Sequence, residues 1–227
     1  MKDKEDKIKK IFYGLFFLVY VLFVGIDINL INGFPVPSYA IKYIGIILVV
    51  AFAVFLKNRQ KNQDGKLVLA ALGITLAADF FLLFTPYYVA GVTIFCAAHL
   101  VYICRYRKKF GLRITVPTVL LLAVVHVLLS EKGSELSLLY AVCGIYGILI
   151  ITATICAEKA ENLPRRSRRA AVAGMILFIL CDINVALFQV LPKESPILGT
   201  VSVLMWVFYY PSQILIAQSI AYYSRLT

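Results

Sequence analysis

One segment, RRSRRAAVAGMILFILCDINVALFQVL (residues 165–191), contains the pattern from which the architecture follows. Four arginines precede 22 residues in which Asp182 is the only charged side chain. At a rise of about 1.5 Å per residue, a helix of this length spans about 33 Å, enough to cross the roughly 30 Å hydrocarbon core of a bilayer. The segment therefore predicts a membrane-spanning helix anchored by basic residues at one end.

The same alternation of basic clusters and apolar runs extends over the whole chain of 227 residues, which is 61% hydrophobic and only 15% charged. A mean hydropathy of +0.86 excludes a soluble domain. Eight spans are predicted, at residues 11–31, 37–56, 67–84, 87–104, 112–129, 136–157, 170–191 and 196–223. The predicted fold class is an all-α, polytopic transmembrane helical bundle, forming one integral membrane domain over residues 1–227.

Two of these runs are weaker, which leaves seven spans as the alternative. Run 37–56 contains Lys42, and run 112–129 contains Pro117 and His126. The first run lacks a small-residue cleavage site before Asp27, so it is interpreted as a retained helix and not as a removed signal peptide.

The distribution of the 23 Lys and Arg residues predicts the topology. Twenty of them fall in the N-terminus, the C-terminus and alternate loops, and three (Lys42, Lys132 and Lys193) fall on the other side. Because short cytoplasmic loops are rich in Lys and Arg, both termini are predicted to be cytoplasmic. The net charge of +11 would then lie on the cytoplasmic surface, where it favours binding of anionic membrane lipids over nucleic acid.

Three ionisable residues are predicted to lie at membrane depth: Lys42, Asp79 and Asp182. Such a group costs about 2.5 to 3.5 kcal/mol to insert and usually marks a functional site. Counting along each helix places Asp79 and Asp182 about 18 Å, and Lys42 about 21 Å, from the cytoplasmic boundary. All three are therefore predicted to share one layer of the membrane.

Two faces of neighbouring helices add polar residues near that layer. Trp206, Tyr209, Tyr210 and Gln213 have the i, i+3, i+4, i+7 spacing of one helical stripe. His99, Tyr102 and Tyr106 form a second stripe, whose last member reaches the basic loop and is interpreted as an interfacial anchor. Pro211 is expected to kink its helix and to free a backbone carbonyl.

Structural roles remain open for the same residues. The aspartates would then pair with Lys42 or bond neighbouring helices, Lys42 would extend toward the outer interface, and His99 and Gln213 would form interhelical hydrogen bonds. Two distant histidines give a weak ligand set, so no metal and no other cofactor is expected.

Several segments together make the chain similar to a known family. AADFFLLF (77–84), GVTIFCAAHLVYI (91–103), LFILCDINVALF (177–188) and YYPSQILIAQSIAYY (209–223) resemble the YhhN-like family of eight-span membrane proteins, the lysoplasmalogenases. AIKYIGIILVV (40–50) resembles the family's Lys-containing start of the second helix. Ala78 and Cys181 stand where the family usually has Gly and Ser before the aspartates, and Tyr43 replaces a common Pro.

The resemblance implies a hydrolase that cleaves the vinyl ether bond of a lysophospholipid taken from the bilayer, releasing a fatty aldehyde and a glycerophospho-headgroup. This chemistry needs one carboxylic acid and one carboxylate, and Asp79 and Asp182 are predicted to be that catalytic pair. Lys42 would hold one of them ionised. His99, Tyr102, Tyr209 and Gln213 would bind water or the glycerol backbone, and basic cytoplasmic residues would help to hold the phosphate.

A different class of function uses the same aspartates. GITLAADFFLLF (73–84) loosely resembles GMILFILCDINVALF (174–188), and a four-plus-four repeat would favour a small proton-coupled transporter or lipid exporter. In either case the protein is predicted to be an integral, multi-pass membrane protein, and its compact loops suit a bacterial cytoplasmic membrane.

Overall fold

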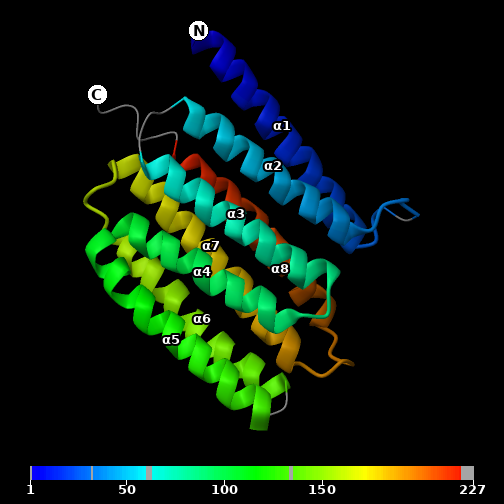
Figure 1. The fold of residues 1–227 in the computed structure, drawn as a ribbon. Helices are drawn as coiled ribbons and strands as arrows, with labels where there is room; N and C mark the ends of the chain where they lie inside the picture. Colours follow the sequence, from blue (N-terminus) through cyan, green and yellow to red (C-terminus); the bar gives the residue numbers. More distant parts are fainter. Residues whose placement is uncertain (1, 32, 60–62, 133–134, 221–227) are drawn as a thin grey trace.

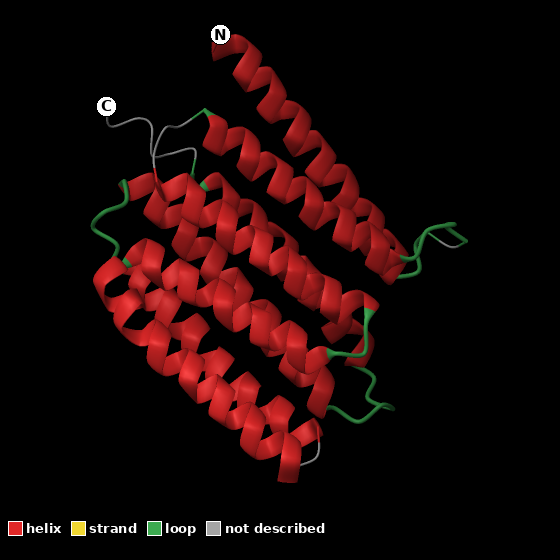
Figure 2. Cartoon of the chain, viewed as in Figure 1, coloured by secondary structure: helices red, strands yellow, loops and turns green. Residues whose placement is uncertain are grey.

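The computed structural model describes residues 2–31, 33–59, 63–132 and 135–220, and within them it contains eight α-helices and no strand (Figures 1 and 2). All eight are long and apolar enough to cross a membrane, which confirms the predicted all-α, eight-span architecture. In chain order the helices are α1 (Lys2–Asp27), α2 (Ser38–Asn58), α3 (Gln63–Phe84), α4 (Tyr88–Tyr106), α5 (Lys108–Lys132), α6 (Glu135–Glu158), α7 (Arg165–Val190) and α8 (Leu198–Gln218).

The helices run up and down in one bundle, in which α3, α4, α7 and α8 occupy the middle (Figure 1). The most extensive contacts are between α7 and α8 and between α3 and α4. On one side α2 packs against α1, α3 and α8, and on the other side α6 packs against α4, α5 and α7. The end at which α1, α3, α5 and α7 begin is called the basic end below, because it carries most of the basic clusters.

Several helices extend beyond the apolar runs into charged segments. At the basic end α3 begins at Gln63, four residues before the predicted start, and α7 begins at Arg165, five residues early. Lys and Arg are good helix formers whose long side chains reach water, so the helix continues where the hydrocarbon ends.

The end of α1 away from the basic end differs from the prediction, which continued the span to residue 31. The helix ends at Asp27, and Asn29 takes a left-handed conformation with φ 58°. The N–H groups of Leu30 and Ile31 turn back and donate to the Gly25 carbonyl, at 2.8 and 3.0 Å. An Asn in this conformation is a common helix stop. The predicted end of the eighth span at residue 223 lies outside the described residues.

Both prolines expected within spans lie inside continuous helices, Pro117 in α5 and Pro211 in α8. Pro211 has no N–H to donate to the carbonyl of Val207, four residues earlier. The hydroxyl of Tyr20 on α1 donates to that carbonyl at 3.4 Å. The carbonyl expected to be freed is therefore satisfied by a neighbouring helix, as the interior of a membrane requires.

The tight packing of α7 against α8 depends on Gly174. A Cβ atom there would lie 3.0 Å from the Ser212 carbonyl oxygen, which belongs to the backbone and cannot rotate away. Small residues at such positions allow two membrane helices to approach closely.

We expect Gly174→Ala to destabilise the bundle by roughly 1 to 3 kcal/mol, because overpacking forces α7 and α8 apart. The measurement is the thermal unfolding midpoint of the detergent-solubilised protein. Gly147→Ala is the matched control, since a Cβ at Gly147 meets nothing within 4 Å. Equal midpoints for the two variants would contradict the proposed role of Gly174.

Candidate active site

Asp79 lies five residues before the end of α3 and is buried, with 4% of its surface exposed. The hydroxyl of Tyr209, from α8, donates a hydrogen bond to its Oδ2 at 2.7 Å. The ring of Tyr209 in turn packs edge-on against Phe178 of α7, with ring centroids 5.3 Å apart. The carboxyl group of Asp79 is thus hydrogen-bonded to a neutral hydroxyl whose ring packs against another aromatic side chain.

Asp182 lies on α7 and has the same kind of partner. The hydroxyl of Tyr146, from α6, donates to its Oδ2 at 2.7 Å. Sequence reasoning missed Tyr146, although a signal was available. It lies eleven residues before the predicted end of its span at residue 157, or about 16 Å from the boundary, close to the depth predicted for the aspartates.

His99 of α4 connects the two Asp–Tyr pairs. Its Nε2 lies 3.4 Å from the Tyr146 hydroxyl oxygen, and its ring packs against that of Phe178 at 5.2 Å. The Phe178 ring also packs against that of Tyr209, the partner of Asp79. The structure therefore brings Asp79, Asp182, His99 and Tyr209 into one neighbourhood formed by α3, α4, α6, α7 and α8.

Four buried polar atoms beside this neighbourhood form no hydrogen bond of normal geometry, although the Thr75 and Tyr102 side chains interact with each other: Thr75 Oγ1, His99 Nδ1, Tyr102 OH and Gln213 Oε1. Thr75 lies one turn from Asp79 on α3, and Gln213 lies one turn from Tyr209 on α8, in both cases toward the basic end. Tyr102 follows His99 in the same direction, with ring centroids 5.9 Å apart. Buried polar atoms of this kind are normally satisfied by ordered water or by a polar ligand.

The structure gives Lys42 a partner that the sequence analysis did not identify. Its Nζ lies 2.7 Å from Oδ2 of Asp27, the last residue of α1, and Ser38 Oγ also donates to that carboxylate. The expectation that Lys42 pairs with Asp79 or Asp182 is replaced by this ion pair. Residue counting gives depth along a helix but not the direction in which the side chain points.

Trp206 separates Lys42 from the aspartates. The Lys42 ammonium lies 5.2 Å from the Trp206 ring centroid, and the same ring packs edge-on against Tyr209 at 5.2 Å. Tyr210, the next residue, instead packs against Phe16, Tyr20 and Phe23 of α1. The predicted stripe of α8 is thus divided between the candidate site and the contact with α1.

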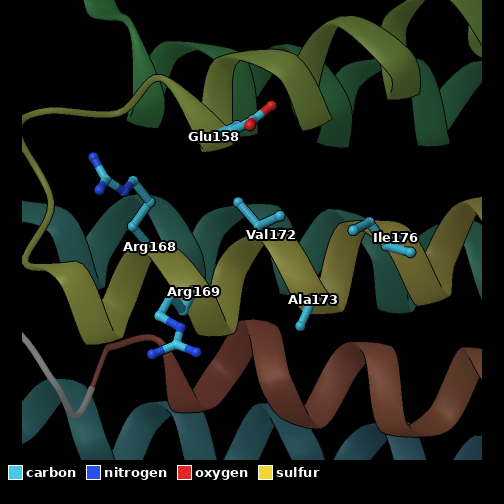
Figure 3. Close-up of a pocket in the computed structure, with 6 residues that line it drawn as sticks. All are labelled: Glu158, Arg168, Arg169, Val172, Ala173 and Ile176. Atoms are coloured by element: carbon cyan, nitrogen blue, oxygen red, sulfur yellow. The ribbon is translucent and has the colours of Figure 1, made fainter.

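Surface pockets occur elsewhere in the described structure. The pocket in Figure 3 lies between the end of α6 and the start of α7 and is lined by Glu158, Arg168, Arg169, Val172, Ala173 and Ile176. Asp182 is on a different face of α7, shared with Phe178 and Met175. Among the described residues, no group of three or more His, Cys, Asp or Glu side chains could hold a metal ion.

The fold and this site define an integral, multi-pass membrane protein with two tyrosine-bonded aspartates in the middle of its helical bundle. The sequence profile of the YhhN family matches residues 38–220, which is more than half of the chain, and the protein belongs to that family. No curated protein and no solved structure matches it.

We expect Lys42→Met to destabilise the protein by roughly 3 kcal/mol, because it leaves the mostly buried Asp27 carboxylate without its counter-charge. The double variant Lys42→Met/Asp27→Asn should recover most of that loss. Thermal unfolding in detergent measures both. If the double variant is no more stable than the single one, the ion pair is not what Lys42 contributes.

Proposed function

We propose that this protein is a lysoplasmalogenase-like hydrolase that cleaves the vinyl ether bond of a lysophospholipid in the membrane. Two observations support the proposal together: membership of the YhhN family, and two aspartates that share one buried neighbourhood with His99. The second observation supports the reaction type, because paired carboxyl groups can provide an acid and a base.

The proposed reaction begins when one carboxylic acid donates its proton to the vinyl carbon that is not bonded to the ether oxygen. The carbon bonded to oxygen becomes an oxocarbenium ion, to which water adds while the second carboxylate accepts the water's proton. The resulting hemiacetal then collapses: its hydroxyl proton returns to the first carboxylate, and its bond to the glycerol oxygen breaks as the second carboxyl group gives that oxygen the proton taken from water. The products are a fatty aldehyde and a glycerophospho-alcohol, so one water molecule is consumed and the carboxyl groups are regenerated.

The surroundings of the aspartates suit this sequence of steps. Tyr209 and Tyr146 hold each carboxyl group by one oxygen through a neutral hydroxyl, which fixes its orientation without adding a positive charge. Water or a glycerol hydroxyl would satisfy Thr75, Tyr102 and Gln213, whose free atoms lie next to the site. The substrate would enter laterally from lipid, with the basic end facing the cytoplasm.

We expect Asp79→Asn and Asp182→Asn each to reduce aldehyde release from lysoplasmalogen at least a hundredfold, because each removes one proton-transfer group. The assay uses purified, detergent-solubilised protein, with the saturated ether analogue as a substrate control. Asp6→Asn is the matched control variant, since Asp6 is exposed near the start of α1.

Full activity of either site variant would contradict the paired-carboxylate mechanism. Absence of aldehyde from well-folded wild-type protein would contradict the hydrolase itself. In that case the transporter hypothesis predicts proton-dependent flux in sealed liposomes, which a detergent assay does not detect.

We expect His99→Gln to lower kcat by about tenfold or more, because His99 contacts Tyr146 and its buried Nδ1 has no hydrogen-bond partner within the protein. His126→Gln is the matched control. His126 Nδ1 bonds to the Leu122 carbonyl of its own helix at 2.8 Å, away from the aspartates. Equal loss of activity in the two variants would indicate a structural role for both histidines.

A further inference from the structure

Arg105, near the end of α4, is a buried arginine with an unused donor. Its Nε and Nη2 donate to the two carboxylate oxygens of Asp64, on α3, at 2.7 and 2.9 Å. The side chain is 3% exposed, and its Nη1 has no hydrogen-bond partner. A guanidinium group always carries its charge, so this nitrogen is a strong buried donor without an acceptor.

Tyr106 adds a second unused polar atom beside the same guanidinium group. It is 2% exposed, so it is buried and not the interfacial anchor expected from the sequence. The Arg105 guanidinium lies 5.3 Å from the Tyr106 ring centroid, and the two side chains interact with each other. The Tyr106 hydroxyl oxygen can accept from the guanidinium, but its own O–H and Arg105 Nη1 have no acceptor of normal hydrogen-bond geometry. Buried donors of this kind cost free energy unless a ligand or water satisfies them.

These two residues line a surface pocket at the basic end, where the segment between α6 and α7 covers the end of α4. Asn162 of that segment donates to the Arg105 carbonyl at 3.1 Å. The side chains that surround the pocket are Arg107, Lys108, Lys109, Arg113 and Lys159, with Glu161 as the one acidic group among its lining residues. The pocket thus combines an excess of positive charge with buried donors.

This pocket is distinct from the candidate active site. Asp64, which holds Arg105, precedes Asp79 by fifteen residues on α3, or about 22 Å along the helix axis. In a glycerophospholipid only three carbons separate the ether oxygen from the phosphate oxygen. A lysolipid whose ether oxygen lies at Asp79 therefore leaves its own phosphate well short of the Asp64–Arg105 pair.

We propose that this pocket binds the phosphate group of a second molecule, either an anionic phospholipid headgroup or a soluble phosphate ester. Arg105 Nη1 and the Tyr106 hydroxyl would donate to the phosphate oxygens from inside, and Arg107 and Lys109 would face it from the surface. A basic pocket between helices at the membrane surface is suited to this chemistry.

The test measures binding to the purified protein by calorimetry, with short-chain phosphatidylglycerol, short-chain phosphatidylcholine and glycerol 3-phosphate as separate ligands. We expect the wild type to prefer phosphatidylglycerol or glycerol 3-phosphate to phosphatidylcholine. Arg107→Gln/Lys109→Gln should weaken that binding roughly tenfold, because two charges are lost. Tyr106→Phe, which keeps the ring and removes the free hydroxyl, should weaken it about threefold.

Arg165→Gln/Arg166→Gln is the matched control, because it removes two exposed charges at the same end but outside the pocket. Equal weakening by the control would overturn the proposal, and so would unchanged binding in Tyr106→Phe, since the buried donors would then play no part. Tight binding of glycerol 3-phosphate would identify a soluble ester as the ligand, and binding of phosphatidylglycerol alone would identify a lipid headgroup. The binding measurement needs no enzymatic turnover, so it stands apart from the proposed hydrolase.

Discussion

The structure depends on one constraint, which is that hydrocarbon offers no hydrogen bonds to a buried polar group. Within each span the helix supplies the hydrogen bonds of the backbone N–H and C=O groups. Pro211 has no N–H for the carbonyl of Val207, and the Tyr20 hydroxyl of a neighbouring helix donates to that carbonyl instead. Polar side chains face the same demand. Lys42, Arg105 and the two central aspartates each have a partner on another helix. The positions of these side chains therefore help to determine which helices are neighbours.

The bundle meets this demand in two ways. In the pairs Lys42 with Asp27 and Arg105 with Asp64, charge is balanced by opposite charge. Asp79 and Asp182 are instead bonded by tyrosine hydroxyls, which carry no charge. An ion pair holds a carboxyl group in its ionised form, whereas a hydroxyl partner leaves it able to exchange a proton. This difference in partners supports the acid and base roles proposed for Asp79 and Asp182.

Much of the fold could be predicted from the sequence, because hydropathy and charge fix the number of spans and the depth of each residue. Tyr209 and His99 were found beside the aspartates because their depth and stripe spacing matched. Counting along a helix does not give the direction of a side chain around it, nor which helices are neighbours. This is why the partner of Lys42 was wrongly assigned and Tyr146 was missed. The burial of Tyr106 also depends on the α6–α7 segment that packs over the end of α4, which no local pattern indicates.

The candidate site has two unlike sides, and this difference orients any amphiphile that binds there. Toward the basic end lie the buried polar atoms of Thr75, Tyr102 and Gln213. Toward the opposite end the neighbour is aromatic, because Trp206, one turn before Tyr209 on α8, packs edge-on against the Tyr209 ring at 5.2 Å. A polar group gains hydrogen bonds only on the first side, and an apolar chain loses none on the second. The same asymmetry favours ordered water on the side of the basic end, because polar atoms stabilise water where an aromatic surface does not.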